Sequence, residues 1–85
     1  MSNVVMYSTG FCPYCVRAKI LLKQKNVPFT DVRIDIESER RSEMEQRSGQ
    51  TSVPQIFIDD FHVGGCDDLF ALEHQDQLDN KLGLN

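Results

Sequence analysis

Short apolar runs along the chain predict four strands. Residues 4–7 are continuously apolar and β-prone, which is typical of a short strand buried on both faces. Residues 29–36 alternate between apolar and polar positions, which predicts a half-exposed strand at the edge of a sheet. Its predicted buried side consists of Val32, Ile34 and Ile36. Residues 55–58 and 61–63 flank the polar pair Asp59-Asp60, so they predict a hairpin.

The segment after the first strand has helical spacing. Pro13 suits the first position of a helix, where its missing N–H costs nothing, and residues 26–28 end the pattern. The predicted core side of this helix consists of Val16, Ile20, Leu21 and Leu22. The predicted solvent side carries Arg17, Lys19, Lys23 and Lys25.

Two further helices and a tail complete the pattern. Residues 38–48 predict a second helix that is capped near Ser38, is stopped by Gly49 and has Met44 as its one large apolar residue. A third helix is predicted to start at about Asp67. Its core candidates are Leu69, Phe70 and Leu72. The tail, with Leu78, Leu82 and Leu84, predicts either a short helix or a frayed end.

The element order is therefore β-α-β-α-β-β-α, which belongs to the α/β class. Strands joined through a helix should pair in parallel and the hairpin antiparallel, giving a mixed four-stranded sheet flanked by three helices. With 85 residues the chain can build only one core, so we expect a single domain over residues 1–85.

Charge and hydropathy exclude several classes of function. The formal net charge is −4, and the one basic pair, Arg40-Arg41, is surrounded by glutamates and is expected to lie on the surface. Nucleic-acid binding needs convergent cations, so we do not expect it. No apolar run approaches the roughly 20 residues of a membrane span, and residues 1–3 do not resemble the start of a secretory signal. We expect a cytoplasmic monomer.

The three cysteines carry the candidate chemistry. Cys12 and Cys15 form a Cys-x-x-Cys pair at a predicted strand-to-helix turn, where free backbone N–H groups and the helix dipole favour a thiolate. Cys12 is therefore the expected nucleophile, and the more buried Cys15 is placed to attack the mixed disulfide that Cys12 forms. A metal site completed by Cys66 and a histidine, His62 or His74, is the alternative at this point.

Three segments resemble the signature segments of the glutaredoxins, most closely the short bacterial dithiol type. They are Cys12-Pro13-Tyr14-Cys15, then Ser52-Val53-Pro54-Gln55-Ile56-Phe57-Ile58, then Gly64-Gly65-Cys66-Asp67-Asp68-Leu69. Their order and spacing match over essentially the whole chain. The resemblance implies a thioredoxin-like fold, with glutathione as reductant and as part of the substrate, and no metal.

The resemblance also implies a binding site for glutathione. Pro54 would follow a cis peptide bond, so that Val53 can pair with the backbone of the tripeptide. The backbone of Cys66 and Asp67 would hold the γ-glutamyl carboxylate, the Asp67 carboxylate would take the ammonium group, and Tyr14 would pack beside the sulfur. For the glycine carboxylate the candidates are Gln46 and Arg47.

One position departs from the family pattern. Many glutaredoxins carry a lysine three or four residues before the nucleophile, whereas this chain has Ser8 and Thr9 there. This departure shifts the stabilisation of the thiolate towards the helix N-terminus.

We therefore expect a glutathione-dependent thiol–disulfide oxidoreductase that acts on protein disulfides and glutathionylated proteins. One alternative is a dimer bridged by a [2Fe–2S] cluster through Cys12 and glutathione thiolates, although Pro13 beside the nucleophile disfavours it. A small zinc-binding interaction module is the other.

Overall fold

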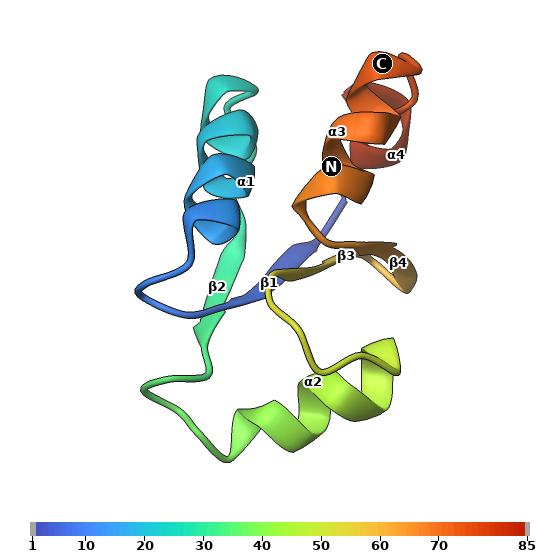
Figure 1. Cartoon of the computed structure of the whole chain (residues 1–85). Helices are drawn as coiled ribbons and strands as arrows, with labels where there is room; N and C mark the ends of the chain where they lie inside the picture. Colours follow the sequence, from blue (N-terminus) through green and yellow to red (C-terminus); the bar gives the residue numbers. More distant parts are fainter. Residues whose placement is uncertain (1, 85) are drawn as a thin grey trace.

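A four-stranded mixed sheet forms the centre of the molecule (Figure 1). The computed structural model describes residues 2–84; Met1 and Asn85, the two ends of the predicted domain, lie outside the described residues. The strand order is β2-β1-β3-β4. β1 pairs in parallel with β2 and antiparallel with β3, and β3 pairs antiparallel with β4. The strands are β1 (Val4–Ser8), β2 (Thr30–Arg33), β3 (Gln55–Ile58) and β4 (Phe61–Gly64). The predicted thioredoxin-like architecture is confirmed.

The helices cover both faces of the sheet. In Figure 1, α1, α3 and α4 lie on one face and α2 lies on the other. Their bounds are α1 (Pro13–Gln24), α2 (Arg40–Ser48), α3 (Cys66–His74) and α4 (Leu78–Leu82). The core is divided accordingly, with a larger cluster that includes Met6, Leu22 and Leu69 and a smaller one around Tyr7 and Met44. The tail forms a short helix, whose Leu78 and Leu82 are buried.

The predicted core side of α1 is partly wrong. Leu21 and Leu22 are buried, but Val16 and Ile20 are each 49% exposed. The buried stripe begins instead with Cys15 and Ala18, which recur at helical spacing with Leu22. The small side chains of Cys15 and Ala18 let the first turns of the helix lie close to the sheet, and Leu21 and Leu22 continue the buried side.

Two lysines predicted on the solvent side of α1 are ion-paired. Lys25 Nζ lies 2.8 Å from Glu73 Oε1 and 2.6 Å from Asp79 Oδ1, which ties α1 to α3 and α4. Lys19 Nζ lies 2.7 Å from Asp31 Oδ2 on β2. The methylene groups of Lys19 and Lys25 can pack against the protein because each ammonium group is paired with a carboxylate.

The prediction of a strand over residues 29–36 is also wrong in its second half, because β2 ends at Arg33. β2 is an edge strand, but the chain turns away after Arg33, whose carbonyl accepts from the backbone N–H of Ile36 and Glu37. Ile34 remains buried, whereas Ile36 is 71% exposed. α2 then starts at Arg40, with Glu39 at the N-cap position and no side-chain cap, so the predicted cap at Ser38 is not formed.

The stop of α2 and the hairpin agree with the predictions. Gly49 ends α2 in the left-handed conformation, with φ 69°. Asp59, in the turn between β3 and β4, has φ 53°, a conformation that aspartate tolerates. Among residues 2–84, no helix is long and apolar enough to cross a membrane.

Candidate active site

Cys12 lies where the loop after β1 meets the N-terminus of α1. It is the N-cap residue, in an extended conformation, and Pro13 follows it in the first turn. Its Sγ accepts a hydrogen bond from the backbone N–H of Cys15 over 3.1 Å. A sulfur in this position meets the positive end of the helix, and an N–H that points at it favours the thiolate.

Cys15 is buried one turn further along α1, and its environment differs sharply from that of Cys12. Cys15 is fully buried, whereas Cys12 is partly exposed. Burial, followed by the hydrogen bond with Cys12, raises the pKa of Cys15 to about 12. The backbone N–H of Thr9 acts in the opposite direction. The two thiols are therefore asymmetric, as the sequence predicted.

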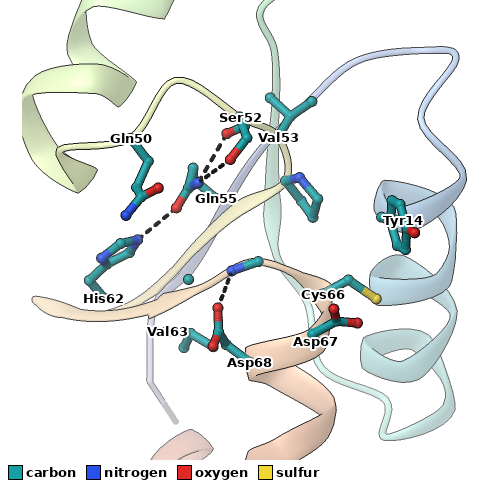
Figure 2. Close-up of a pocket in the computed structure, with 13 residues that line it drawn as sticks. Tyr14, Gln50, Ser52, Val53, Gln55, His62, Val63, Cys66, Asp67 and Asp68 are labelled. Atoms are coloured by element: carbon teal, nitrogen blue, oxygen red, sulfur yellow. Dashed lines mark hydrogen bonds between the residues drawn. The ribbon is translucent and has the colours of Figure 1, made fainter.

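A groove with a volume of about 330 Å³ lies beside this pair (Figure 2). It is lined by five residues predicted to contact glutathione, namely Tyr14, Val53, Pro54, Cys66 and Asp67. The peptide bond between Val53 and Pro54 is cis, as expected. The carbonyl oxygen of Val53 lies 3.9 Å from Cys12 Sγ, so the groove and the nucleophile adjoin.

The N-terminus of α3 forms one wall of the groove. Gly65 is the N-cap residue, and its N–H donates to Asp68 Oδ2 over 3.0 Å (Figure 2). Asp68 therefore caps the helix and leaves Asp67 exposed on the groove. A Cβ on Gly64 would lie 2.3 Å from the Asp68 carboxylate, and φ there is 110°, so only glycine fits.

Cys66 lies at the start of α3 and is only 3% exposed. Burial raises the pKa of the Cys66 thiol, an effect that the nearby Arg17 partly offsets. Its environment favours the neutral thiol.

The candidates for the glycine carboxylate lie away from the groove. Arg47 Nη1 donates to the hydroxyl of Tyr7 over 2.9 Å, and its guanidinium lies 4.1 Å from the centre of the Phe57 ring. Gln46 is exposed on α2, and neither residue lines the groove. Arg41 does not line the groove either, but its Nη1 donates to the carbonyl of Thr51 over 3.2 Å, which brings its guanidinium to the segment that leads to Val53.

The other end of the groove carries polar residues that the sequence did not assign to the site. Gln55 is a buried polar residue whose Nε2 donates to the carbonyl of Ser52 over 3.0 Å. Its Oε1 therefore faces His62 Nε2 over 2.7 Å, so that nitrogen carries the proton (Figure 2). Gln55 and Ser52 lay within the second signature segment, whereas nothing in the sequence pointed to His62 as part of a groove.

An ion pair on the far side of Cys12 holds the loop before it. Arg33 binds Asp35 through two hydrogen bonds of 2.8 and 2.7 Å, and Asp35 Oδ2 accepts from the backbone N–H of Gly10 over 2.9 Å. Arg33 and then Gly10 hold the pKa of Asp35 well below its usual range. The carboxylate stays charged and keeps its hold on the loop.

The metal alternative can be compared with the same geometry. Within residues 2–84, no three His, Cys, Asp or Glu side chains are grouped closely enough to hold a metal ion. His62, one of the possible ligands, is bound to Gln55 instead.

Comparisons with known proteins all match this chain to glutaredoxins. A model of the glutaredoxin family matches residues 4–63. The chain is 52% identical over 82 residues to a glutaredoxin of Pseudomonas aeruginosa, covering 96% of this chain and 98% of the relative. It is 54% identical over 82 residues to glutaredoxin 3 of Escherichia coli K12, covering 96% and 99% of the two chains.

Solved structures agree. A crystal structure of a buckwheat glutaredoxin–glutathione complex superposes with a TM-score of 0.89 at 30% identity, covering 96% of this chain and 77% of that one. The solution structure of a glutaredoxin from Brucella melitensis superposes with a TM-score of 0.82 at 48% identity, covering 98% and 92%.

Proposed function

This chain belongs to the glutaredoxin family of thiol–disulfide oxidoreductases, and we propose that it uses glutathione to reduce protein disulfides and glutathionylated proteins. One observation carries the proposal. A partly exposed thiol at a helix N-terminus adjoins a groove that ends in a second helix N-terminus, that of α3. The first feature suits a nucleophile, and the second suits the carboxylate of a small anionic ligand.

The reaction follows from the asymmetry of the two thiols. The Cys12 thiolate attacks one sulfur of the substrate disulfide, forms a mixed disulfide and releases the other sulfur as a thiolate, which takes up a proton. The mixed disulfide can then follow two routes. In one, Cys15 attacks the Cys12 sulfur and releases the protein thiol. In the other, a glutathione thiolate attacks the glutathione sulfur bound to Cys12, which forms oxidised glutathione and frees the Cys12 thiolate. The first route oxidises the enzyme, and two glutathione molecules then reduce it.

The groove supports a specific orientation of glutathione. Val53 would pair with the backbone of the tripeptide, and Tyr14 would pack beside its sulfur. The γ-glutamyl carboxylate would accept from the backbone N–H groups of Cys66 and Asp67 at the start of α3. The Asp67 carboxylate, which is not used as the cap, would then bind the ammonium group.

For the glycine carboxylate we propose Arg41 in place of Gln46 and Arg47. The guanidinium of Arg47 is already engaged by Tyr7 and Phe57 beneath the sheet. Arg41 reaches the carbonyl of Thr51, two residues before Val53, and keeps most of its donors for a ligand. Its ion-pair partner Glu45 is 3.7 Å away and the two side chains are 50% and 40% exposed, so the competing ion pair is weak.

The remaining expectations are proposals of the same kind. We propose glutathione and disulfide-containing or glutathionylated proteins as partners, a monomeric state, and no resident metal. Pro13 beside Cys12 disfavours the cluster-bridged dimer. Cys12 and Cys15 must return to thiols in each cycle, which supports a reducing compartment such as the cytoplasm.

A glutathione-coupled assay on a small glutathione mixed disulfide and on a protein disulfide tests the proposal. Cys12→Ser should lose both activities, because no other thiol is exposed at the helix start. Cys15→Ser should keep the reduction of the glutathione mixed disulfide and lose the protein-disulfide route. Substantial turnover by Cys12→Ser would place the nucleophile elsewhere, and loss of both activities in Cys15→Ser would give that residue a larger role than resolution.

A further inference from the structure

A chain of polar side chains lies between α1 and β2, close to the buried thiol of Cys15. Lys19 Nζ lies 2.7 Å from Asp31 Oδ2, and Asp31 Oδ1 accepts from Ser8 Oγ over 2.5 Å. Ser8 is fully buried, and the side chains of Lys19 and Asp31 are 20% and 30% exposed. The reaction described above uses none of these three residues.

Helix spacing and the contacts of Asp31 locate the ammonium group of Lys19 relative to Cys15. Lys19 follows Cys15 by four residues on α1, so the two side chains share a helix face. Through Asp31, Lys19 is connected to Ser8, the last residue of β1. Thr9 comes next, and its backbone N–H lies close enough to the sulfur of Cys15 to lower the pKa of that thiol. The ammonium group is thus held at the same end of β1 as the N–H that contacts Cys15.

The charges that face Cys15 change when the substrate binds covalently. In the free enzyme, burial, the hydrogen bond with Cys12 and the charge of Cys12 raise the pKa of Cys15, while Thr9 N–H and Lys19 lower it. In the mixed disulfide the Cys12 sulfur is bonded and neutral, so both of its contributions disappear. Burial is then opposed by Thr9 N–H and Lys19, together with Arg33 from β2, which also interacts with Cys15.

We propose that Lys19, held by Asp31 and Ser8, is a positioning residue that stabilises the Cys15 thiolate in the step that resolves the mixed disulfide. The inference rests on the proposed dithiol route. In this step Cys15 loses its proton to solvent, and its thiolate attacks Cys12. The new Cys12–Cys15 disulfide forms, the bond from Cys12 to the substrate breaks, and the released thiolate takes up a proton. Lys19 therefore acts on the dithiol route alone, since glutathione performs the same step in the monothiol route.

Ellman's reagent, an aromatic disulfide, separates the two steps in a stopped-flow experiment. Attack by Cys12 releases a first coloured thiolate, and resolution by Cys15 releases a second. Lys19→Met keeps the length of the side chain and removes its charge, whereas Lys19→Arg keeps the charge. Lys23→Met, at an exposed position of the same helix, is the matched control.

We expect Lys19→Met to slow the second phase by about 3- to 10-fold and to leave the first phase unchanged, because it removes one nearby charge from a buried thiolate. The pH profile of the second phase should move to higher pH. Lys19→Arg should restore most of the rate, and Lys23→Met should match the wild type. If Lys19→Met does not fold, Lys19→Gln serves in the same measurement.

Other outcomes overturn the inference in distinguishable ways. A second phase in Lys19→Met within a factor of about 1.5 of the wild type, or with an unmoved pH profile, would leave Lys19 as a purely structural ion pair. Equal slowing of both phases in Lys19→Met would also leave Lys19 with a purely structural role. If Cys15→Ser kept the second phase, the dithiol route itself would be wrong. If Cys15→Ser lost the second phase while Lys19→Met showed it at the wild-type rate, only the role of Lys19 would be overturned.

Discussion

Iodoacetamide should label the native chain once, at Cys12. The reagent reacts with thiolates, so the rate at each cysteine depends on its ionised fraction and on access to the sulfur. Cys12 is partly exposed at the start of α1, whereas Cys15 and Cys66 are buried. Burial raises the pKa of both of these thiols. The experiment therefore compares the labelling of the native chain with that of the unfolded chain.

The structure gives the size of the difference for Cys15. With its pKa raised to about 12, about one Cys15 in 100,000 is ionised at pH 7. An ordinary thiol is about 3% ionised at that pH, so Cys15 should react about 3,000-fold more slowly in the native chain than in the unfolded one. Complete burial of the side chain slows it further. Raising the pH from 7 to 9 should increase its ionised fraction about 100-fold.

Peptide mapping by mass spectrometry after timed alkylation measures this directly. The native chain should carry one carbamidomethyl group, on Cys12, while the chain unfolded in urea should carry three. Cys12→Ser should take up none over the same interval, because burial, the largest contribution at Cys15, remains in that variant. Native labelling of Cys15 within about tenfold of its unfolded rate would refute the assigned burial and the asymmetry of the pair.

Three further predictions concern binding and stability. Asp67→Ala and Arg41→Ala should each raise the KM for glutathione in the coupled assay, and an unchanged KM would remove that residue from the binding site. Met44→Ala should cost about 2–5 kcal/mol in urea unfolding, because Met44 is the one fully buried side chain of α2. The hydrogen bond from Arg40 lowers the pKa of Glu43, so that contribution to stability is present above about pH 4 and is lost as the pH falls. Glu43→Gln should therefore be less stable than the wild type at pH 7, with a difference that shrinks below pH 4 in thermal unfolding.

The sequence predicted the elements well because their signals are local. Pro13 at a helix start, Gly49 at a helix stop and a polar pair in a hairpin each act within a few residues. The same holds for the five groove residues from Tyr14 to Asp67, since each lies in a signature segment that carries its own backbone conformation. The parallel pairing of β1 with β2 and the antiparallel hairpin then followed from the rule for connections. The position of β1 between β2 and β3 was not predicted.

The errors arose where the outcome depends on distant partners. Hydrophobicity alone favoured Val16 and Ile20, yet the sheet packs against the stripe that contains Ala18. Lys25 pairs with carboxylates 48 and 54 positions away, which no local pattern indicates. Arg47 had the right charge and helix for an anion site, but its guanidinium is held by aromatic rings on the α2 face.

The missing lysine before the nucleophile shows how distant residues change the electrostatics of the site. In its place, Arg33 at the end of β2 and Asp35 in the turn that follows hold the loop at Gly10. A Cβ on Gly10 would lie 2.3 Å from Arg33 Nη2, so the loop approaches this pair as closely as a glycine allows. Positive charge thus reaches the thiols from the side of Cys15, while Cys12 relies on the N–H groups of α1. Because each thiol has its own source of stabilisation, a change at Lys19 should alter resolution without altering the first attack.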